Sequence, residues 1–303
     1  MNQGLVKIKW AMLRSRIYIE NFRPSGFYIP IILFLIFTLI LTNLYHMHLH
    51  NDVWSSMEAA SGNALHFCEK NRLDQIIRQP SNTWSNLGFL LVGMVIMSVA
   101  IHDYKNKDRK SASNFLVRYP LFSALYAVSC IYTFIGSFLY HASLTAKFQK
   151  LDQTGLYSAL IMILIFNLYK TLPFIRRKDS WVSTHKWAIV LVVLINFAIM
   201  QWLYKININI LFPSLIVLIA ITSFYYIHKV SRHNFYINYF MTAFIVLFAS
   251  SFIWILDRQN IVCSPESPWQ GHALWHILNA VSLLFIYMYY RSGTVPLVSE
   301  KEV

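Results

Sequence analysis

Residues 119–140 read YPLFSALYAVSCIYTFIGSFLY, and this stretch decides the fold class of the chain. It contains no charged side chain, and an α-helix needs about 20 mostly apolar residues to cross a bilayer. Its apolar residues do not alternate with polar ones, as they would in a strand of a membrane β-barrel. The stretch therefore predicts a transmembrane helix.

Similar charge-poor stretches recur along the chain. They cover residues 27–47, 82–102, 152–172, 187–204, 209–228, 236–256 and 271–290. Hydrophobic residues make up 56% of the 303 residues and charged residues 13%, whereas soluble domains have nearer about 25% charged residues. The sequence predicts an all-α, polytopic membrane helix bundle.

The chain carries a formal net charge of +13, from 26 Lys and Arg residues against 13 Asp and Glu. In a soluble protein this excess would indicate a nucleic-acid partner. Here most basic residues fall on every second connection, namely 1–26, 103–118, 173–186, 229–235 and 291–303. Basic loops face the cytoplasm, so we expect both termini there and no nucleic-acid partner.

These spans divide the chain into five parts. We expect an uncleaved first helix, because its polar lead is long and no small-residue cleavage pattern follows Tyr45. The expected parts are a basic cytoplasmic segment (1–26), an extra transmembrane helix (27–47), an outer connecting segment (48–81), a seven-helix core (82–290) and a cytoplasmic tail (291–303).

Five polar side chains inside or at the ends of spans are functional candidates, because such groups are costly in a membrane. They are Ser137, His141, Asp152, His272 and His276. Given the predicted orientation, all five lie near the outer ends of their helices. They can therefore meet at one depth, facing the periplasm or an organelle lumen.

The spacing of the histidines suits zinc. His272 and His276 lie one helical turn apart on one face, and His141 from another helix adds a third ligand. Three histidines leave a coordination position open, as in catalytic zinc sites. Asp152 is placed to accept a proton from attacking water, and Ser137 to donate to a developing oxyanion.

Each residue also has a simpler interpretation. The histidines could be hydrated interfacial side chains, Asp152 a helix N-cap, and Ser137 a donor to its own helix at Thr133. Taken together, these interpretations do not explain five polar groups at one depth.

His46, His48 and His50 scatter around a helix axis and are interpreted as interfacial. Cys130 is expected to be packing, whereas Cys68 and Cys263 lie in outer connections where a disulfide can form.

Three motifs resemble the alkaline ceramidase family, a seven-helix superfamily that also includes adiponectin-type receptors and a GPI-remodelling lipase. They are CEKNRLDQIIRQPSNTWSN (68–86), SFLYH (137–141) with Asp152 following, and HALWH (272–276). The resemblance covers roughly residues 66–290, so the helix at 27–47 precedes it.

The resemblance implies zinc on His141, His272 and His276, with Ser137 and Asp152 beside it, and a Cys68–Cys263 disulfide. It also implies calcium ligands at Glu69, Asn71 and Gln79. At this site the sequence departs from the pattern of the family, because Gln79 stands where the family has an acid and His66-Phe67 where it has Asp-Trp. Calcium affinity follows ligand charge, so we do not expect a calcium site.

The resulting hypothesis is a zinc-dependent, intramembrane lipid amide hydrolase that cleaves ceramide to a fatty acid and a long-chain base. Two alternatives remain open from the residues. One is a zinc-dependent esterase or phospholipase. The other is a receptor or lipid sensor in which zinc is structural, although no fourth protein ligand is placed to close the site.

Overall fold

A computed structural model describes residues 25–60, 67–106, 114–171, 206–230 and 237–293. The described residues form α-helices and contain no β-strand, which confirms the predicted all-α membrane bundle. The helices are α2 (Ser25–Met47), α3 (Pro80–Ser85), α4 (Leu87–Lys105), α5 (Phe115–Arg118), α6 (Pro120–Ser143), α7 (Ala146–Thr171), α9 (Ile208–Val230), α10 (Ile237–Arg258) and α11 (Gly271–Ser292).

Six helical segments of this described part are long and apolar enough to cross a membrane. They are Tyr28–Met47, Pro80–Lys105, Pro120–Ser143, Ala146–Leu168, Ile237–Arg258 and Gly271–Ser292. Helix α9 adds a shorter apolar segment, Ile210–Tyr225, at the predicted span 209–228. The predicted span 187–204 lies outside the described residues. The chain is a multi-pass membrane protein.

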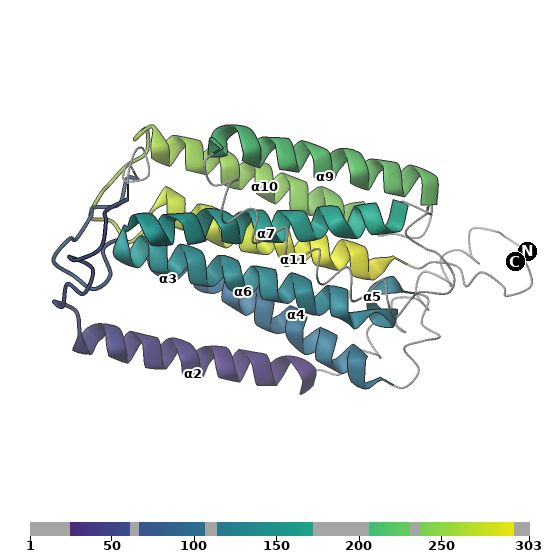
Figure 1. The fold of residues 1–303 in the computed structure, drawn as a ribbon, viewed down its shortest axis with the longest axis horizontal. Helices are drawn as coiled ribbons and strands as arrows, with labels where there is room; N and C mark the ends of the chain where they lie inside the picture. Colours follow the sequence, from purple (N-terminus) through teal and green to yellow (C-terminus); the bar gives the residue numbers. More distant parts are fainter. Residues whose placement is uncertain (1–24, 61–66, 107–113, 172–205, 231–236, 294–303) are drawn as a thin grey trace, which may run out of the picture.

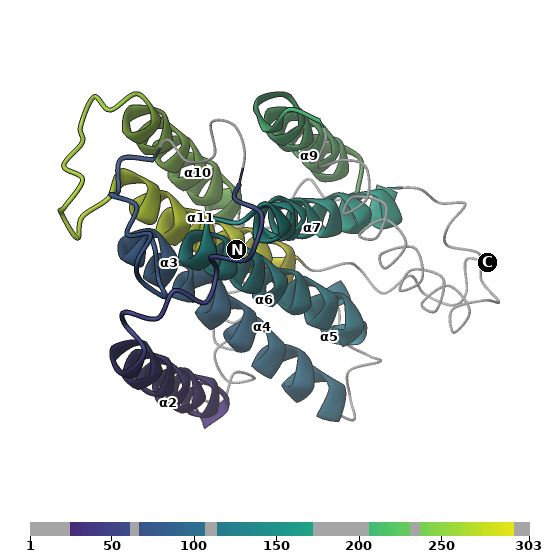
Figure 2. The same ribbon diagram turned by 60° about the vertical axis from the view of Figure 1, so that its left-hand side comes forward.

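The long helices run side by side, as Figure 1 shows. Helix α6 packs against α4 and α7, α10 packs against α11, and α9 packs against α7. Helix α2 lies at one edge beside α4 and keeps most of its apolar surface exposed (Figure 2). Segment 48–60 and the loop between α10 and α11 lie together at one end of the bundle, and α5 lies at the other (Figure 1).

A tight turn reverses the chain between α6 and α7. Leu144 adopts a left-handed conformation (φ 51°), and its N–H donates to the carbonyl of Tyr140 at 2.6 Å. Helix α7 then begins at Ala146, six residues before the predicted span. Asp152 therefore lies inside the helix, and its interpretation as an N-cap is wrong. The turn brings Asp152 back beside the end of α6.

Two glycines let α6 and α7 approach closely. A Cβ atom on Gly136 would lie 2.4 Å from the carbonyl oxygen of Leu151 and 2.9 Å from the backbone nitrogen of Asp152. On α7, a Cβ atom on Gly155 would lie 2.8 Å from the Cα atom of Thr133. The Thr133 hydroxyl donates to the Gly155 carbonyl at 2.9 Å across this seam. Small residues at such crossings allow close backbone packing in membranes.

The Gly136→Ala variant tests the importance of this seam. The added methyl group meets backbone atoms, so the helices must separate and Asp152 must move away from α6. We expect a loss of stability of about 1–3 kcal/mol, typical of overpacking, and a fall in turnover. Thermal unfolding in detergent and an activity assay measure both effects.

Gly88→Ala is the matched control for Gly136→Ala. Its Cβ atom would lie 3.3 Å from the Ala280 side chain, a tight contact, and 3.8 Å from the Cα atom of Ile277, an ordinary van der Waals distance. We expect a smaller effect on both measurements. Equal losses in the two variants would contradict a specific role for the α6–α7 seam.

A buried ion pair joins α4 and α11 at the end of the bundle away from the α6–α7 turn. The guanidinium group of Arg291 donates to the two carboxylate oxygens of Asp103 at 2.5 and 2.9 Å. Both side chains are buried. The side chain of Asn114 also donates to the carbonyl groups of Tyr290, Arg291 and Gly293. These contacts fix α11 relative to α4.

Candidate metal centre

Three buried histidines from two helices converge where α6 ends and α11 begins. His141 lies in the last turn of α6, and His272 and His276 lie in the first turns of α11. Each offers one ring nitrogen to a group whose members all lie within 4.8 Å of one another. The exposed fraction of each residue is 4% or less. Among the described residues, this is the group of His, Cys, Asp or Glu side chains arranged to hold a metal ion.

Hydrogen bonds define which nitrogen of His141 faces the centre. Its Nδ1 lies 2.7 Å from Oε1 of Gln79, which accepts a hydrogen bond. Nδ1 must therefore carry the ring proton, because the amide oxygen has none to donate. The neutral imidazole then keeps its lone pair on Nε2, which faces the other histidines.

The same reasoning applies to His276. The hydroxyl group of Ser85 donates to the carbonyl of Asn82 at 2.9 Å, so its oxygen accepts from Nδ1 of His276 at 2.8 Å. Nε2 of His276 therefore carries the lone pair. In metal sites, such outer hydrogen bonds select the ligand nitrogen and fix the ring orientation.

His272 is held by its backbone and by ring stacking. The backbone N–H of His272 donates to Oδ1 of Asp257 at 3.1 Å, and the imidazole ring stacks on the ring of Phe67 with centroids 3.9 Å apart. Nδ1 of His272 is buried and has no hydrogen-bond partner among the described residues. Nε2 of His272 lies 3.2 Å from Nε2 of His141.

This arrangement fits a metal ion. Two histidines have an Nε2 lone pair facing the centre, and two ring nitrogens are 3.2 Å apart. Tetrahedral zinc with bonds of about 2.0–2.1 Å places neighbouring nitrogens about 3.3 Å apart. A set of three neutral imidazoles is also the type of ligand that zinc accepts.

The two remaining predicted residues lie beside the histidines. The Ser137 hydroxyl is 3.4 Å from Nε2 of His276, an interhelical contact that favours the predicted place in the site over the alternative of a bond back to Thr133. The carboxyl group of Asp152 interacts in turn with the Ser137 hydroxyl. The five residues predicted from sequence therefore lie together at one end of the bundle.

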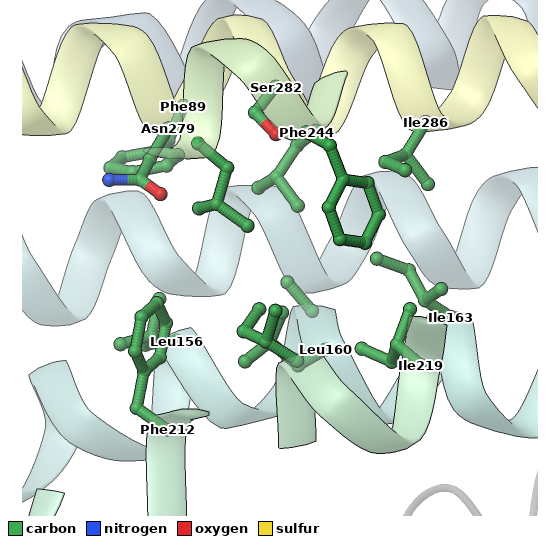
Figure 3. Close-up of a pocket in the computed structure, with 14 residues that line it drawn as sticks. Phe89, Leu156, Leu160, Ile163, Phe212, Ile219, Phe244, Asn279, Ser282 and Ile286 are labelled. Carbon is green, nitrogen blue, oxygen red and sulfur yellow. The ribbon is translucent and has the colours of Figure 1, made fainter. Parts of the chain in front are cut away.

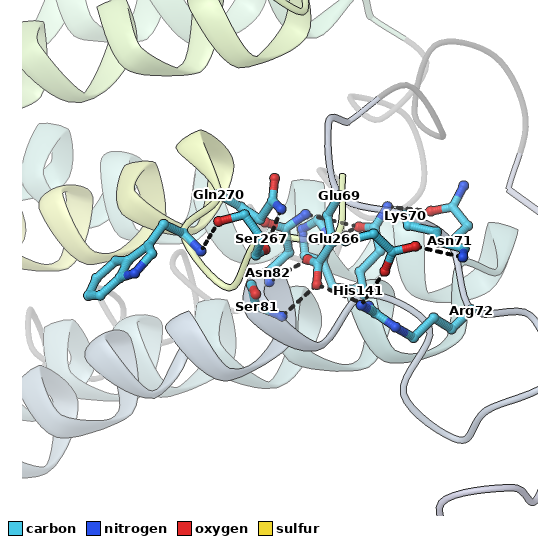
Figure 4. Close-up of polar contacts among 12 residues, drawn as sticks. Glu69, Lys70, Asn71, Arg72, Ser81, Asn82, His141, Glu266, Ser267 and Gln270 are labelled. Carbon is cyan, nitrogen blue, oxygen red and sulfur yellow. Dashed lines mark hydrogen bonds and ion pairs between the residues drawn. The ribbon is translucent and has the colours of Figure 1, made fainter. Parts of the chain in front are cut away.

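A polar network that includes Glu69, Asn71 and Asn82 lies beside His141 (Figure 4). Gln79 donates to Asn71 at 2.6 Å, and Glu69 accepts the backbone N–H groups of Ser81 and Asn82 at 2.8 and 2.9 Å. Burial raises the pKa of Glu69, against the lowering effect of those N–H groups. Of the three residues of the implied calcium site, Gln79 thus contacts Asn71 and His141, and Glu69 accepts backbone N–H groups.

A disulfide and a carboxylate fasten the segment before α3 to the start of α11. Cys68 and Cys263 are joined, with Cα atoms 5.5 Å apart. Asp257, at the end of α10, accepts the N–H groups of both Cys68 and His272. Its carboxylate therefore caps the N-terminus of α11, where negative charge is favourable.

An apolar cavity lies inside the bundle, with Phe89, Leu160 and Phe244 in its wall (Figure 3). It lies between α4, α7, α9, α10 and α11, and apolar side chains from all five helices line it. The ring of Phe89, in its wall, lies 6.3 Å from the ring of His276. The polar side chains in the wall are Asn279 and Ser282, one and two turns after His276. Apart from these two side chains, the wall of the cavity is apolar.

Sequence reasoning missed three residues of this centre: Ser85, Phe67 and Asp257. The resemblance implied a calcium ligand at Gln79, at a site that the sequence did not support, and the structure pairs Gln79 with His141. The residue types of Ser85 and Phe67 do not indicate a functional role, because serine is common at helix starts and phenylalanine in loops. Asp257 had a weak signal, as an acid beside the apolar span 236–256. His46, His48 and His50 do not join the centre.

A family model named Ceramidase matches residues 59–301. The chain belongs to the ceramidase family. The matched region contains all five site residues and begins after α2. A comparison with curated proteins gives no match. This ceramidase is therefore a hydrolase that acts on the amide bond of ceramide, and its substrate is a lipid. Family membership and the three buried histidines together indicate a metal-dependent enzyme.

Proposed function

We propose that the chain is a zinc-dependent ceramidase that hydrolyses the amide bond within the membrane, close to its outer surface. The observation that carries the proposal is the convergence of His141, His272 and His276, with Ser137 and Asp152 next to them. The chemistry that bound zinc supplies is polarisation of the amide carbonyl and a lowered pKa, to about 7, for water at the metal.

Asp152 acts as the general base. Its carboxylate takes a proton from the attacking water and passes it to the nitrogen of the leaving amine. General acid–base catalysis of this kind contributes about 10²–10⁴-fold to a rate. The α6–α7 turn and the glycine seam keep the carboxylate beside Ser137.

Ser137 stabilises the negative charge that develops on the carbonyl oxygen. Its hydroxyl lies on the same helical face as His141, one turn earlier, and next to the ring of His276. Such a donor acts in a site shielded from water, where its hydrogen bond is stronger than in solution.

The apolar cavity takes the acyl chain. Its lining residues come from five helices and are mostly Leu, Ile and Phe, which match a saturated chain and exclude water. Water enters from the polar outer end, beside residues 67–82. The proposed orientation has both termini in the cytoplasm and the site on the periplasmic or lumenal side.

Purified protein with defined metal content tests the proposal. We expect about one zinc ion per chain, and release of a free long-chain base and a fatty acid from ceramide, measured by lipid mass spectrometry. Removal of the metal by a chelator should stop the reaction, and zinc should restore it. Zinc-loaded protein that releases no long-chain base would overturn the proposal. Turnover of phospholipid without ceramide cleavage would favour an esterase instead.

The Gln79→Met variant tests how the outer hydrogen bond supports the metal. Methionine keeps the length of the side chain but cannot accept from His141, so the ring loses its fixed orientation. We expect metal affinity to fall by about 10–100-fold, typical for an outer-sphere partner. Competition with a chromophoric chelator measures it. Gln79→Glu retains an acceptor and is the control, and an equal loss in both variants would contradict the role of this hydrogen bond.

A further inference from the structure

The guanidinium group of Arg258 lies between two aromatic rings at the mouth of the metal centre. Its Cζ atom is 5.8 Å from the ring centroid of Phe67 and 5.4 Å from that of Trp254. The Phe67 ring in turn stacks on His272, at 3.9 Å. One ring therefore separates the cation from a histidine of the metal centre.

Arg258 is partly buried and has no carboxylate partner among the described residues, unlike three other cations of the outer segment. Lys70 pairs with Glu266, Arg78 with Asp52, and Arg72 with Glu69 and Glu266. For Arg258, the described residues offer neither an ion pair within 4.0 Å nor a side-chain hydrogen bond. The neighbouring carboxylate of Asp257 instead accepts backbone N–H groups from Cys68 and His272.

A partly buried guanidinium group without an acidic partner has donors available for a ligand. Its planar fork matches an oxyanion such as a phosphate, and the rings hold its plane in a fixed direction. The group also lies at the outer end of the bundle, where the polar end of a lipid reaches the membrane surface. In a ceramide held by its amide at the histidines, the polar end of the sphingoid base lies only a few bonds from the reacting carbonyl.

We propose that Arg258 binds an anionic, phosphate-type group at the polar end of the substrate, and that this ceramidase accepts N-acyl sphingoid lipids carrying such a group. The inference rests on the proposed function for the position of the amide. It goes beyond that function in naming the substrate class and the residue that recognises it.

Kinetics on two matched lipids test the inference. We compare N-octanoyl sphingosine with its C1 phosphate ester, using the wild-type protein, Arg258→Gln and Arg258→Lys. For the phosphate ester, we expect Arg258→Gln to raise KM about tenfold, the effect of losing one charge-assisted hydrogen bond, with kcat little changed. For the neutral lipid, KM should stay within about twofold. Arg258→Lys should raise the KM for the phosphate ester less than Arg258→Gln does, because lysine keeps the positive charge but lacks the planar pair of N–H donors of the guanidinium group.

Lys147→Gln is the control for overall charge, since Lys147 is an exposed cation in the first turn of α7. It should leave both KM values unchanged, and thermal unfolding should show that each variant is folded. Equal changes of KM for the two lipids in Arg258→Gln, or an equal effect of Lys147→Gln, would overturn the inference.

Binding without catalysis separates the two proposals. Native mass spectrometry of the metal-free protein should show the phosphate ester bound to the wild type and about tenfold weaker binding to Arg258→Gln. If the wild type binds it through Arg258 but cleaves neither lipid, the proposed function fails, while Arg258 stands as the residue that binds the phosphate group. If the wild type cleaves the neutral lipid but does not bind the phosphate ester, the inference fails and the proposed function stands.

Discussion

Asp152→Asn should lower kcat for ceramide by about 10²–10⁴-fold, the range attributed to general acid–base catalysis. The substitution keeps the shape of the side chain and its contact with Ser137, but an amide cannot take a proton from water. Because Asp152 is not among the three histidines arranged to hold a metal ion, the metal content should remain at that of the wild type. Product release, measured by lipid mass spectrometry beside metal analysis of the same sample, tests both statements.

Asp74→Asn provides the matched control for that variant. Asp74 is an exposed carboxylate in the outer segment before α3, and its removal should leave turnover unchanged. Turnover near that of the wild type in metal-loaded Asp152→Asn would show that another group acts as the base. A parallel loss of metal and activity would assign Asp152 to the metal site rather than to proton transfer.

His276→Ala should remove both the metal and the activity. Two imidazoles remain, and the hydroxyl of Ser85 loses the ring that it orients. Loss of a direct ligand should weaken metal binding by more than about 100-fold, the upper range for loss of an outer partner. Elemental analysis and chelator competition measure the change.

His48→Ala is the control for the loss of one imidazole. His48 lies in the turn after α2, and its ring contacts the exposed Asn51 rather than the metal centre. Its substitution should leave metal and activity intact. One tightly held metal ion per chain in His276→Ala would show that the site is built from other residues.

The helical architecture could be predicted from the sequence because the membrane leaves few choices. An uninterrupted apolar stretch such as 119–140 must satisfy its own backbone hydrogen bonds in lipid, and a helix does this locally. The ends of the helices could not be predicted in the same way. Helix α7 begins at Ala146 because the polar residues before Asp152 continue the helix outside the apolar stretch, where hydropathy gives no signal.

The three histidines could also be found from the sequence. His272 and His276 lie on one helical face by their spacing alone, and the alternating direction of the spans brings His141 to the same depth. The order and direction of the helices are enough to bring the three histidines to one depth. Distances such as the 3.2 Å between Nε2 of His141 and Nε2 of His272 do not follow from the order of the helices.

The surroundings of the histidines depended on tertiary structure. The partners Gln79 and Ser85 lie on a short helix and its approach, 62 and 191 residues from the histidines that they contact. The contact of Phe67 with His272, and of Arg258 with Phe67, joins segments that the Cys68–Cys263 disulfide holds together. No local pattern predicts such pairs, because the segments involved are polar and irregular.

The sequence by itself therefore determined the helix class and the residues that converge, since apolar length and helical period act locally. The tertiary structure alone decided which ring nitrogens face the centre, how closely Asp152 approaches through Gly136, and that Arg258 stands beside the site without an acidic partner. These features depend on contacts between segments far apart in the chain, whose geometry is set by packing rather than by local preference.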